Sequence, residues 1–299
     1  MQTLSSPELV EHWLMLQRKR KEHPDLFALR STGLSGLDHI LGGGVEYGQY
    51  VIVGGAQKMG KSTLMQHIAV EGFAKRGEPF LFASAEMTNM NTATRLFSSI
   101  ANIDKGKIRR IALDDQDWLD IEQAAELIKE YQGYWNYGFS KLEDIRAAKQ
   151  KIWTEKKVRV RAIFIDYVQL MEGSANTNNR VEQLAAISRG FKRMCVEDNE
   201  PGILYVASQL KREDIRSHVI SANSFLGTGA LERDMDIGVI IHEIKEDDGR
   251  IVPNARRLTV VGSRDTDVGF CDITFRGETA TIRDRIKDKA AQSMAYWRN

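Results

Sequence analysis

At residues 55–63 the sequence reads Gly55-Ala56-Gln57-Lys58-Met59-Gly60-Lys61-Ser62-Thr63. Two glycines five positions apart, followed by lysine and a hydroxyl residue, have the spacing of a phosphate-binding loop. The apolar residues at 50–53 predict a buried strand before this loop, and the pattern at 62–75 predicts an amphipathic helix after it. A strand, a glycine-rich turn and a helix N-terminus bind phosphate through backbone N–H groups. We therefore expect a nucleoside triphosphate here, with Lys61 reaching its β- and γ-phosphates and Ser62 coordinating Mg²⁺.

The composition is that of an ordinary globular protein. The chain has 299 residues, of which 42% are hydrophobic and 28% charged, and a net charge of +1. These values favour one large α/β domain or two small ones, and they do not indicate a broadly basic nucleic-acid surface. Cys195 and Cys271 have no metal-ligand spacing, which favours a reducing cytoplasm, that of the bacterial host if the chain is phage-encoded. We expect no membrane contact, because no apolar run approaches the roughly 18 residues of a membrane-spanning helix.

Strand and helix patterns alternate along most of the chain. Strands are predicted at 80–84, 161–166, 203–208, 237–242 and 257–262, with helices at 120–131, 141–156 and 181–197. This alternation predicts a mostly parallel sheet with helices on both faces. Strands at 257–262, 270–275 and 279–283 are separated by short turns, which predicts antiparallel strands at one edge. We expect one domain over residues 31–285, preceded by a helical arm at 1–30 and followed by a charged tail at 286–299, a docking peptide or a frayed helix.

The arm begins with a helix-start signal, Ser5-Ser6-Pro7-Glu8, and ends in the basic run 18–21. Leu9, Trp13 and Leu16 then share one face. Such a helix either docks on a neighbouring subunit or folds back onto its own domain, and the sequence leaves both open.

Three predicted strands end in polar side chains. Asp166, Glu86 and Gln209 should meet near the phosphate loop, because open α/β sheets bind ligands at the carboxyl ends of their strands. A carboxylate at position 166 suits Mg²⁺. Glu86 would orient the attacking water, unless it only caps the helix near Thr88, and Gln209 would sense the γ-phosphate, unless it only satisfies backbone groups. Arg264 follows a late strand, where it is either a solvated arginine or one that reaches a neighbour's nucleotide.

These features, in this order, resemble the RecA-like ATPase domain of the DnaB family of replicative DNA helicases, over about residues 32–283. The motifs that carry the resemblance, besides the phosphate loop, are Ser84-Ala85-Glu86-Met87, Leu113-Asp114-Asp115-Gln116-Asp117-Trp118, Ile165-Asp166-Tyr167-Val168-Gln169-Leu170-Met171 and Ser208-Gln209-Leu210-Lys211-Arg212. The resemblance implies an ATP-driven helicase motor: a hexameric ring with ATP and Mg²⁺ between subunits and single-stranded DNA in its channel. It implies a trans-acting role for Arg264, and it favours the helix at 9–21 as one that docks on the adjacent subunit.

Several features depart from the family pattern. Only about thirty residues precede the resembling region, so the sequence predicts a reduced architecture without the usual N-terminal domain. That domain is a ring scaffold and primase contact in the family, so a primase or loader partner remains an open expectation. Gly262 stands where the family commonly has a lysine. The DNA-facing segment 224–230 is uncharged, which leaves backbone N–H groups around Gly227, Thr228 and Gly229 as phosphate contacts, and Arg180 follows a second candidate loop at 173–179, otherwise an ordinary surface loop.

Two other functions remain open from the sequence. The leader at 31–44 also resembles RecA/RadA/KaiC-type ATPases, which act in recombination or regulation. The uncharged channel segment is compatible with an ATP-binding regulatory partner of another helicase, although such a partner would not require Glu86, Asp166 and Arg264 together.

Overall fold

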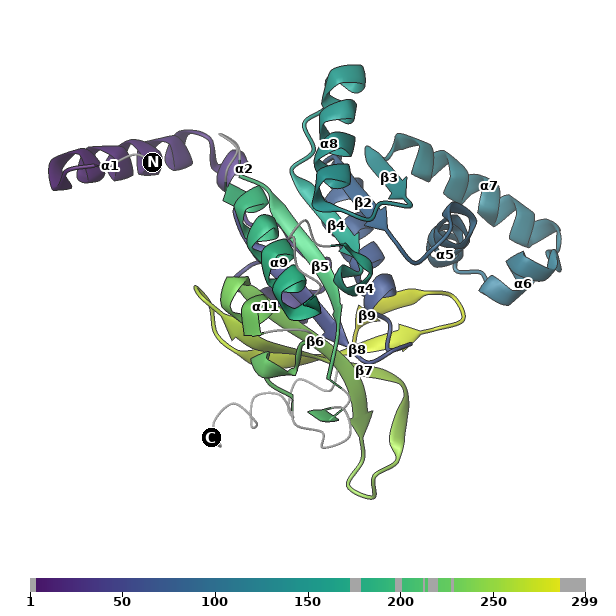
Figure 1. The fold of residues 1–299 in the computed structure, drawn as a ribbon. Coiled ribbons are helices and arrows are strands. Elements are labelled where there is room, and N and C mark those ends of the chain that lie inside the picture. The colour runs from purple at the N-terminus through teal and green to yellow at the C-terminus, as the bar shows by residue number, and fades with distance from the viewer. Residues whose placement is uncertain are drawn as a thin grey trace.

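A single sheet organises the protein. The computed structural model describes residues 4–172, 179–196, 201–211, 213–214, 220–226 and 229–285, and these form nine strands flanked by helices (Figure 1). The strands are β1 Tyr50–Gly55, β2 Phe80–Ser84, β3 Gly133–Tyr137, β4 Ala162–Asp166, β5 Ile203–Gln209, β6 Ile237–Lys245, β7 Ile251–Ser263, β8 Gly269–Arg276 and β9 Thr281–Asp284. The helices are α1 Ser6–Glu22, α2 Pro24–Phe27, α3 Ser35–Ile40, α4 Lys61–His67, α5 Asn89–Ala101, α6 Lys105–Arg110, α7 Asp115–Glu130, α8 Leu142–Lys156, α9 Arg180–Val196 and α11 Gly229–Asp234.

The strand order is β3-β2-β4-β5-β1-β6-β7-β8-β9. Every neighbouring pair from β3 to β6 is parallel, and every pair from β6 to β9 is antiparallel. This confirms the predicted α/β fold with a mostly parallel sheet and antiparallel strands at the C-terminal edge. It also shows that β6, the last parallel strand, turns directly into the antiparallel β7.

Both faces of the parallel region are buried, because alternate side chains of a strand point to opposite faces. Phe164 and Tyr205 lie on the face covered by α3 and α4, and their rings stack with centroids 4.8 Å apart. Ile163 and Ile165 lie on the other face, against α8 and α9. This two-sided burial explains why these strands read as continuous apolar runs in the sequence.

The helix predicted at 62–75 is α-helical only in its first part. After α4 the chain continues as a wider π-helical turn over Ile68–Phe73 and a short 3₁₀ turn over Ala74–Arg76. The wide turn lies where Gly72 packs against the carbonyl oxygen of Ser31, only 2.4 Å from where a Cβ atom would be. Close approach of a second segment therefore decides the local geometry here, which the periodicity of the sequence does not show.

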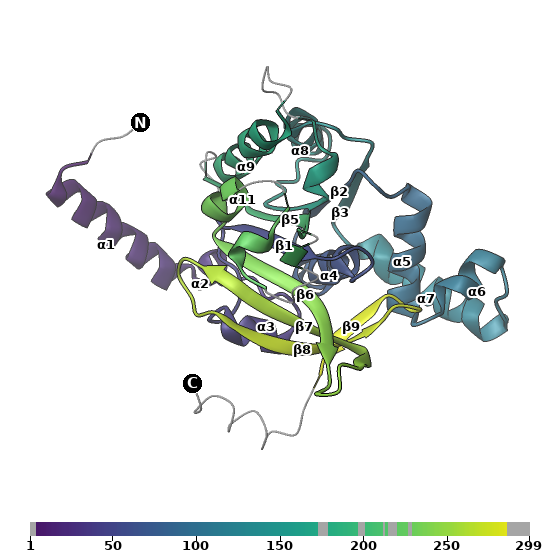
Figure 2. The same ribbon diagram turned by 60° about the horizontal axis from the view of Figure 1, so that its bottom comes forward.

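Helix α1 extends away from the rest of the molecule (Figures 1 and 2). The predicted start signal is present, with the Ser5 N–H and hydroxyl both donating to the Glu8 carboxylate at 2.7 and 2.6 Å. None of its residues is buried, and the Trp13 side chain is 57% exposed. The helix is therefore not folded back onto its own domain, and its apolar face is open.

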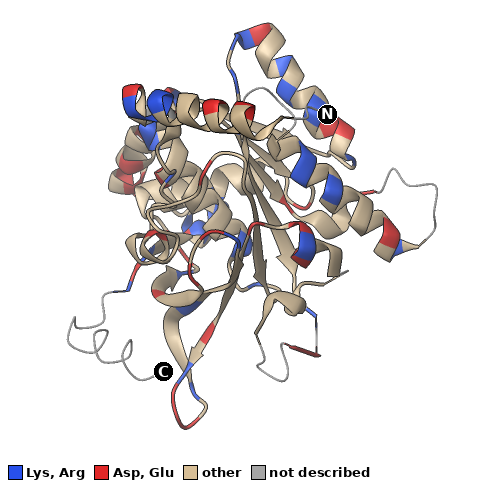
Figure 3. Ribbon diagram, turned by 90° about the vertical axis from the view of Figure 1, so that its left-hand side faces the viewer, with Lys and Arg blue, Asp and Glu red and all other residues tan. Residues whose placement is uncertain are grey.

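Charge is distributed rather than concentrated. Figure 3 shows Lys and Arg interspersed with Asp and Glu along the helices, in keeping with the net charge of +1. Within the described ranges, no helix has the length and apolarity needed to cross a membrane.

Candidate active site

The glycine-rich loop connects β1 to α4 as predicted. Gly60 adopts a φ of 107°, a conformation that favours glycine, and the Phe275 ring lies 2.8 Å from where its Cβ atom would be. The Lys61 ammonium donates to the carbonyl oxygens of Gly55 and Ala56, both at 2.9 Å. Burial lowers the pKa of Lys61, and the nearby Asp166 and Glu86 carboxylates oppose that effect. The lysine thus lies over the loop beside two carboxylates.

Asp166 ends β4 directly beside Ser84, which ends β2. Its side chain is 1% exposed, and burial raises its pKa, while a hydrogen bond from the Ser62 hydroxyl opposes the rise. Its Oδ2 atom is buried and accepts no hydrogen bond from the described residues. A buried carboxylate with an unpaired oxygen beside a hydroxyl is a donor set that suits a hard cation such as Mg²⁺.

The predicted nucleotide-site residues face one cavity of about 450 Å³. Its lining includes Lys61, Ser62, Glu86, Asp166 and Gln209. Glu86 is exposed to solvent in this cavity, whereas Asp166 is buried. Thr88, and not Glu86, caps α5, since its Oγ accepts the N–H of Asn91 at 3.3 Å. The structure therefore brings together five residues that the sequence places on three different strand ends and one loop.

Four further residues at or beside this cavity were missed in the sequence. Arg95 of α5 and Lys105 of α6 bring positive charge to the Glu86 side, and Phe275 and Gly277 of the β8–β9 hairpin cover the loop. Burial lowers the pKa of Arg95, and Asp166 and Glu86 oppose this. A signal for Arg95 did exist, because residues 91, 94 and 95 have the i, i+3, i+4 spacing of one helix face behind Glu86.

Gln169 links the cavity to the neighbouring segments. Its side-chain amide donates to the Ser208 hydroxyl at 2.9 Å and to the carbonyl oxygen of Leu226 at 3.0 Å. Its side-chain oxygen accepts the backbone N–H of Gln209 at 3.2 Å, and its carbonyl oxygen accepts a bond from Arg180 at 2.9 Å. One glutamine thus joins the end of β5 to both segments that the sequence suggests for DNA.

The predicted DNA contacts are described only in part. Arg180 is the first residue of α9 and also bonds Gln183 at 3.0 Å, and Gly229 is the first residue of α11. Gly227 and Thr228 lie outside the described residues, as do the loop at 173–178 and the tail at 286–299.

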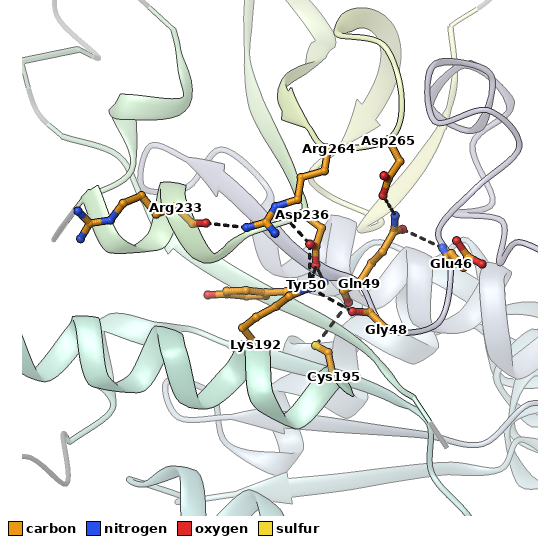
Figure 4. A network of polar contacts seen from close by, with 10 residues as sticks. All are labelled: Glu46, Gly48, Gln49, Tyr50, Lys192, Cys195, Arg233, Asp236, Arg264 and Asp265. Carbon is orange, nitrogen blue, oxygen red and sulfur yellow. Dashed lines mark hydrogen bonds and ion pairs between the residues drawn. The ribbon is translucent and has the colours of Figure 1, made fainter. Parts of the chain in front are cut away.

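Arg264 lies away from the cavity of its own chain and does not line it. It follows β7, and its side chain is 52% exposed. One terminal nitrogen donates to the carbonyl oxygen of Arg233 at 2.7 Å, and its Nε lies 3.5 Å from the Asp236 carboxylate (Figure 4). Whether this arginine serves a neighbouring subunit stays a prediction.

Comparison with known proteins follows the same lines as the geometry. The family model described as DnaB-like helicase C terminal domain matches residues 30–284. The chain belongs to this family. The replicative DNA helicase DnaB of Treponema pallidum is 26% identical over 271 residues, which are 90% of this chain and 58% of the relative. That of Leifsonia xyli is 31% identical over 214 residues, 71% of this chain and 46% of the relative.

The DnaB-like chain spans about half the length of these curated relatives. Among solved structures, an ATPase domain determined on its own matches with a TM-score of 0.82 at 21% identity, covering 94% of this chain and all of that one. A DnaB-like replicative helicase, studied with its primase interactions, matches with a TM-score of 0.79 at 21% identity, covering 92% of this chain and 66% of the other. These matches identify the fold as that of a RecA-like helicase ATPase domain.

Proposed function

We propose that this chain is an ATP-dependent DNA helicase motor that hydrolyses ATP between subunits, moves along single-stranded DNA and unwinds duplex during replication. The observation that carries the proposal is the convergence of Lys61, Ser62, Glu86, Asp166 and Gln209 on one cavity. In this proposal the ATPase domain comprises residues 31–285, with residues 1–30 as a docking arm and 286–299 as a tail.

The residues have separate roles in phosphoryl transfer, where positioning and charge stabilisation do most of the work. Loop residues 55–63 and the Lys61 ammonium bind the phosphates. Ser62 and Asp166 would hold Mg²⁺, which supplies charge neutralisation on the β- and γ-phosphates. Glu86, the exposed carboxylate, orients the attacking water and takes its proton, and Gln209 contacts the γ-phosphate. Arg264 of a neighbouring subunit adds positive charge in the transition state.

Gln169 gives this proposal a route from nucleotide to DNA. Loss of the γ-phosphate would shift Gln209, whose backbone N–H is bonded to Gln169. Gln169 also holds the carbonyl of Leu226, next to the uncharged segment that contains Gly227, Thr228 and Gly229, and it is bonded by Arg180. A change at the phosphate would therefore reach both proposed DNA-contacting segments through one side chain.

Assembly into a ring is supported by two apolar surfaces. Helix α1 exposes Leu9, Val10 and Trp13, and on the opposite side of the molecule α7, which follows α6, exposes Trp118 and Leu119 (Figures 1 and 2). Different surfaces on opposite sides produce head-to-tail contacts, which close into rings. We propose that α1 docks on the α6–α7 side of the next subunit in a homo-oligomer, with a hexameric ring as the expected form.

Replacing Trp13 with serine tests the arm. A buried tryptophan anchor at an interface typically contributes about 2 kcal/mol or more, so the midpoint of association should move to a concentration at least about 30-fold higher. Light scattering over a dilution series measures the mass. Arg18→Ser, which truncates a side chain of the same helix, is the matched control and should associate normally. Equal association of the two variants would exclude α1 as the docking arm.

Steady-state ATP hydrolysis with and without single-stranded DNA tests the function itself, on protein whose mass has been measured. We expect several-fold stimulation by DNA in a particle near six subunits, and loss of hydrolysis in Lys61→Ala shows that the activity belongs to this chain. Fork unwinding then follows as the direct assay. Hydrolysis that DNA does not change would contradict the motor and favour the regulatory alternative.

Two other functions remain as alternatives to this proposal. A RecA/RadA/KaiC-like role in recombination would produce filaments on DNA with strand exchange rather than unwinding of forks. A regulatory subunit of another helicase would hydrolyse little ATP alone. Primase or a loader is a candidate partner, since one structural neighbour was studied with primase, and binding of such a partner to this chain can be measured by co-sedimentation.

A further inference from the structure

One buried carboxylate lies where β1, α9 and the residues after α11 meet. The Asp236 side chain is 6% exposed, and its Oδ2 accepts the backbone N–H of Tyr50 at 2.7 Å (Figure 4). The Lys192 ammonium donates to both carboxylate oxygens, at 2.8 and 2.6 Å. The Asp236 backbone N–H also donates to the carbonyl oxygen of Tyr50 at 2.8 Å. This carboxylate is therefore fixed from the sheet and from a helix.

Arg264 is attached to the same residue at its root and at its tip. Its backbone N–H donates to the carbonyl oxygen of Asp236 at 3.0 Å. Its Nε lies 3.5 Å from Asp236 Oδ1, and a terminal nitrogen donates to the carbonyl oxygen of Arg233 at 2.7 Å. Figure 4 shows the Arg264 side chain directed toward these two anchors, while the Arg233 side chain points away from them. A long and half-exposed side chain is thereby restricted to a few orientations.

The charges around Asp236 do not cancel. One carboxylate faces two cations, and Lys192 is closer to it than Arg264 is. Lys192 therefore takes the larger share of the negative charge, which leaves Arg264 oriented but still electropositive. An arginine that stabilises a developing negative charge across an interface needs both properties, because preorganised charge is what lowers the barrier.

We propose that Asp236 is a positioning residue, which holds Arg264 in the orientation that a nucleotide of the neighbouring subunit requires. This inference rests on the proposed trans-acting role of Arg264. Both anchors, the Arg233 carbonyl and the Asp236 carboxylate, lie at the end of α11, which begins at Gly229 of the proposed DNA-facing segment. A shift of that segment on DNA would therefore move the anchors of Arg264 and tune hydrolysis at the adjacent site.

The first test compares Asp236→Asn with a matched control, Asp272→Asn. Asp272 pairs with Arg257 at 2.7 Å, and in both pairs the carboxylate is 6% exposed and the cation 28% exposed. Both variants should therefore lower thermal stability to a similar extent. Only Asp236→Asn should lower kcat, by up to about 100-fold, as expected for a catalytic group displaced by about 1 Å, with the KM for ATP nearly unchanged. A normal kcat in Asp236→Asn, or an equal loss in both variants, would overturn the proposal.

Mixed oligomers distinguish positioning from a general structural defect. A Lys61→Ala subunit has an impaired site but an intact Arg264, whereas an Arg264→Ala subunit has an intact site. Mixing the two should restore hydrolysis at the interfaces where the intact site meets the intact arginine. Adding Asp236→Asn to the Lys61→Ala subunit should abolish this restored activity, whereas adding it to the Arg264→Ala subunit should change little.

The outcomes separate the two proposals. If Asp236→Asn reduces the restored activity equally from either subunit, or from neither, Asp236 does not act through Arg264. In that case the trans-acting arginine stands and the positioning role is rejected. If Lys61→Ala and Arg264→Ala subunits restore no hydrolysis although they co-assemble, the trans-acting arginine is itself rejected, and the inference about Asp236 with it.

Discussion

The Glu86→Gln variant is expected to hydrolyse ATP about 10³-fold more slowly than the unmodified protein, because the amide cannot take the proton of the attacking water. Nucleotide binding should remain, since Gln keeps the size of the side chain and the phosphate-loop contacts are untouched. Single-turnover hydrolysis gives the rate, and titration with a fluorescent ATP analogue gives the affinity. Glu126→Gln, on the exposed face of α7, is the matched control and should behave normally.

The environments of the two carboxylates explain why Glu86 is chosen for this experiment. Asp166 is 1% exposed, and burial raises its pKa, so its carboxylate depends on a nearby cation to remain charged. Glu86 is exposed in the same cavity and can be reached by water. Two acids in unlike surroundings commonly take unlike roles. A Glu86→Gln variant with near-normal turnover would show that another group, or the phosphate itself, accepts the proton.

Much of the fold could be predicted because the central strands are buried on both faces. Such strands read as apolar runs, and β1, β2, β4 and β5 were all predicted within a few residues of their observed bounds. The edge strand β3 was missed, because its sequence Gly133-Tyr134-Trp135-Asn136-Tyr137 is only half-buried and pairs with β2 alone. At such a position the pairing partner, rather than local preference, decides the conformation.

The candidate site divides in the same way. Lys61 and Asp166 could be found because a loop spacing and a strand end fix where such side chains emerge, although their roles still await the experiments above. Phe275 could not be found, because it comes from a hairpin more than two hundred residues after Gly60 and only tertiary packing brings them together. Gln169 was visible only as part of a motif, since its bonds to Ser208 and Leu226 depend on the relative placement of two other segments.

The Arg264→Ala variant should lose at least about 10³-fold in turnover, the range expected for an arginine that stabilises the transition state of phosphoryl transfer. Its own cavity does not include Arg264, so nucleotide binding by the isolated subunit should be unchanged. Steady-state hydrolysis by the assembled particle and ATP-analogue binding at low protein concentration measure the two quantities. Arg250→Ala, which removes an exposed arginine with a side chain 76% accessible at the tip of the β6–β7 hairpin, is the control.

The relation between kcat and affinity decides how Arg264 acts. A fall in kcat with unchanged affinity means that the arginine contacts phosphate only in the transition state, whereas an equal fall in affinity means that it binds the ground state as well. Arg264→Lys adds a second criterion, because a lysine keeps the charge but cannot bond the Arg233 carbonyl and approach Asp236 with one planar group. Activity near that of the unmodified protein in Arg264→Ala would remove the arginine from the site. Each subunit would then have to complete the charge stabilisation from its own Arg95 and Lys105, the two cations that already face its cavity.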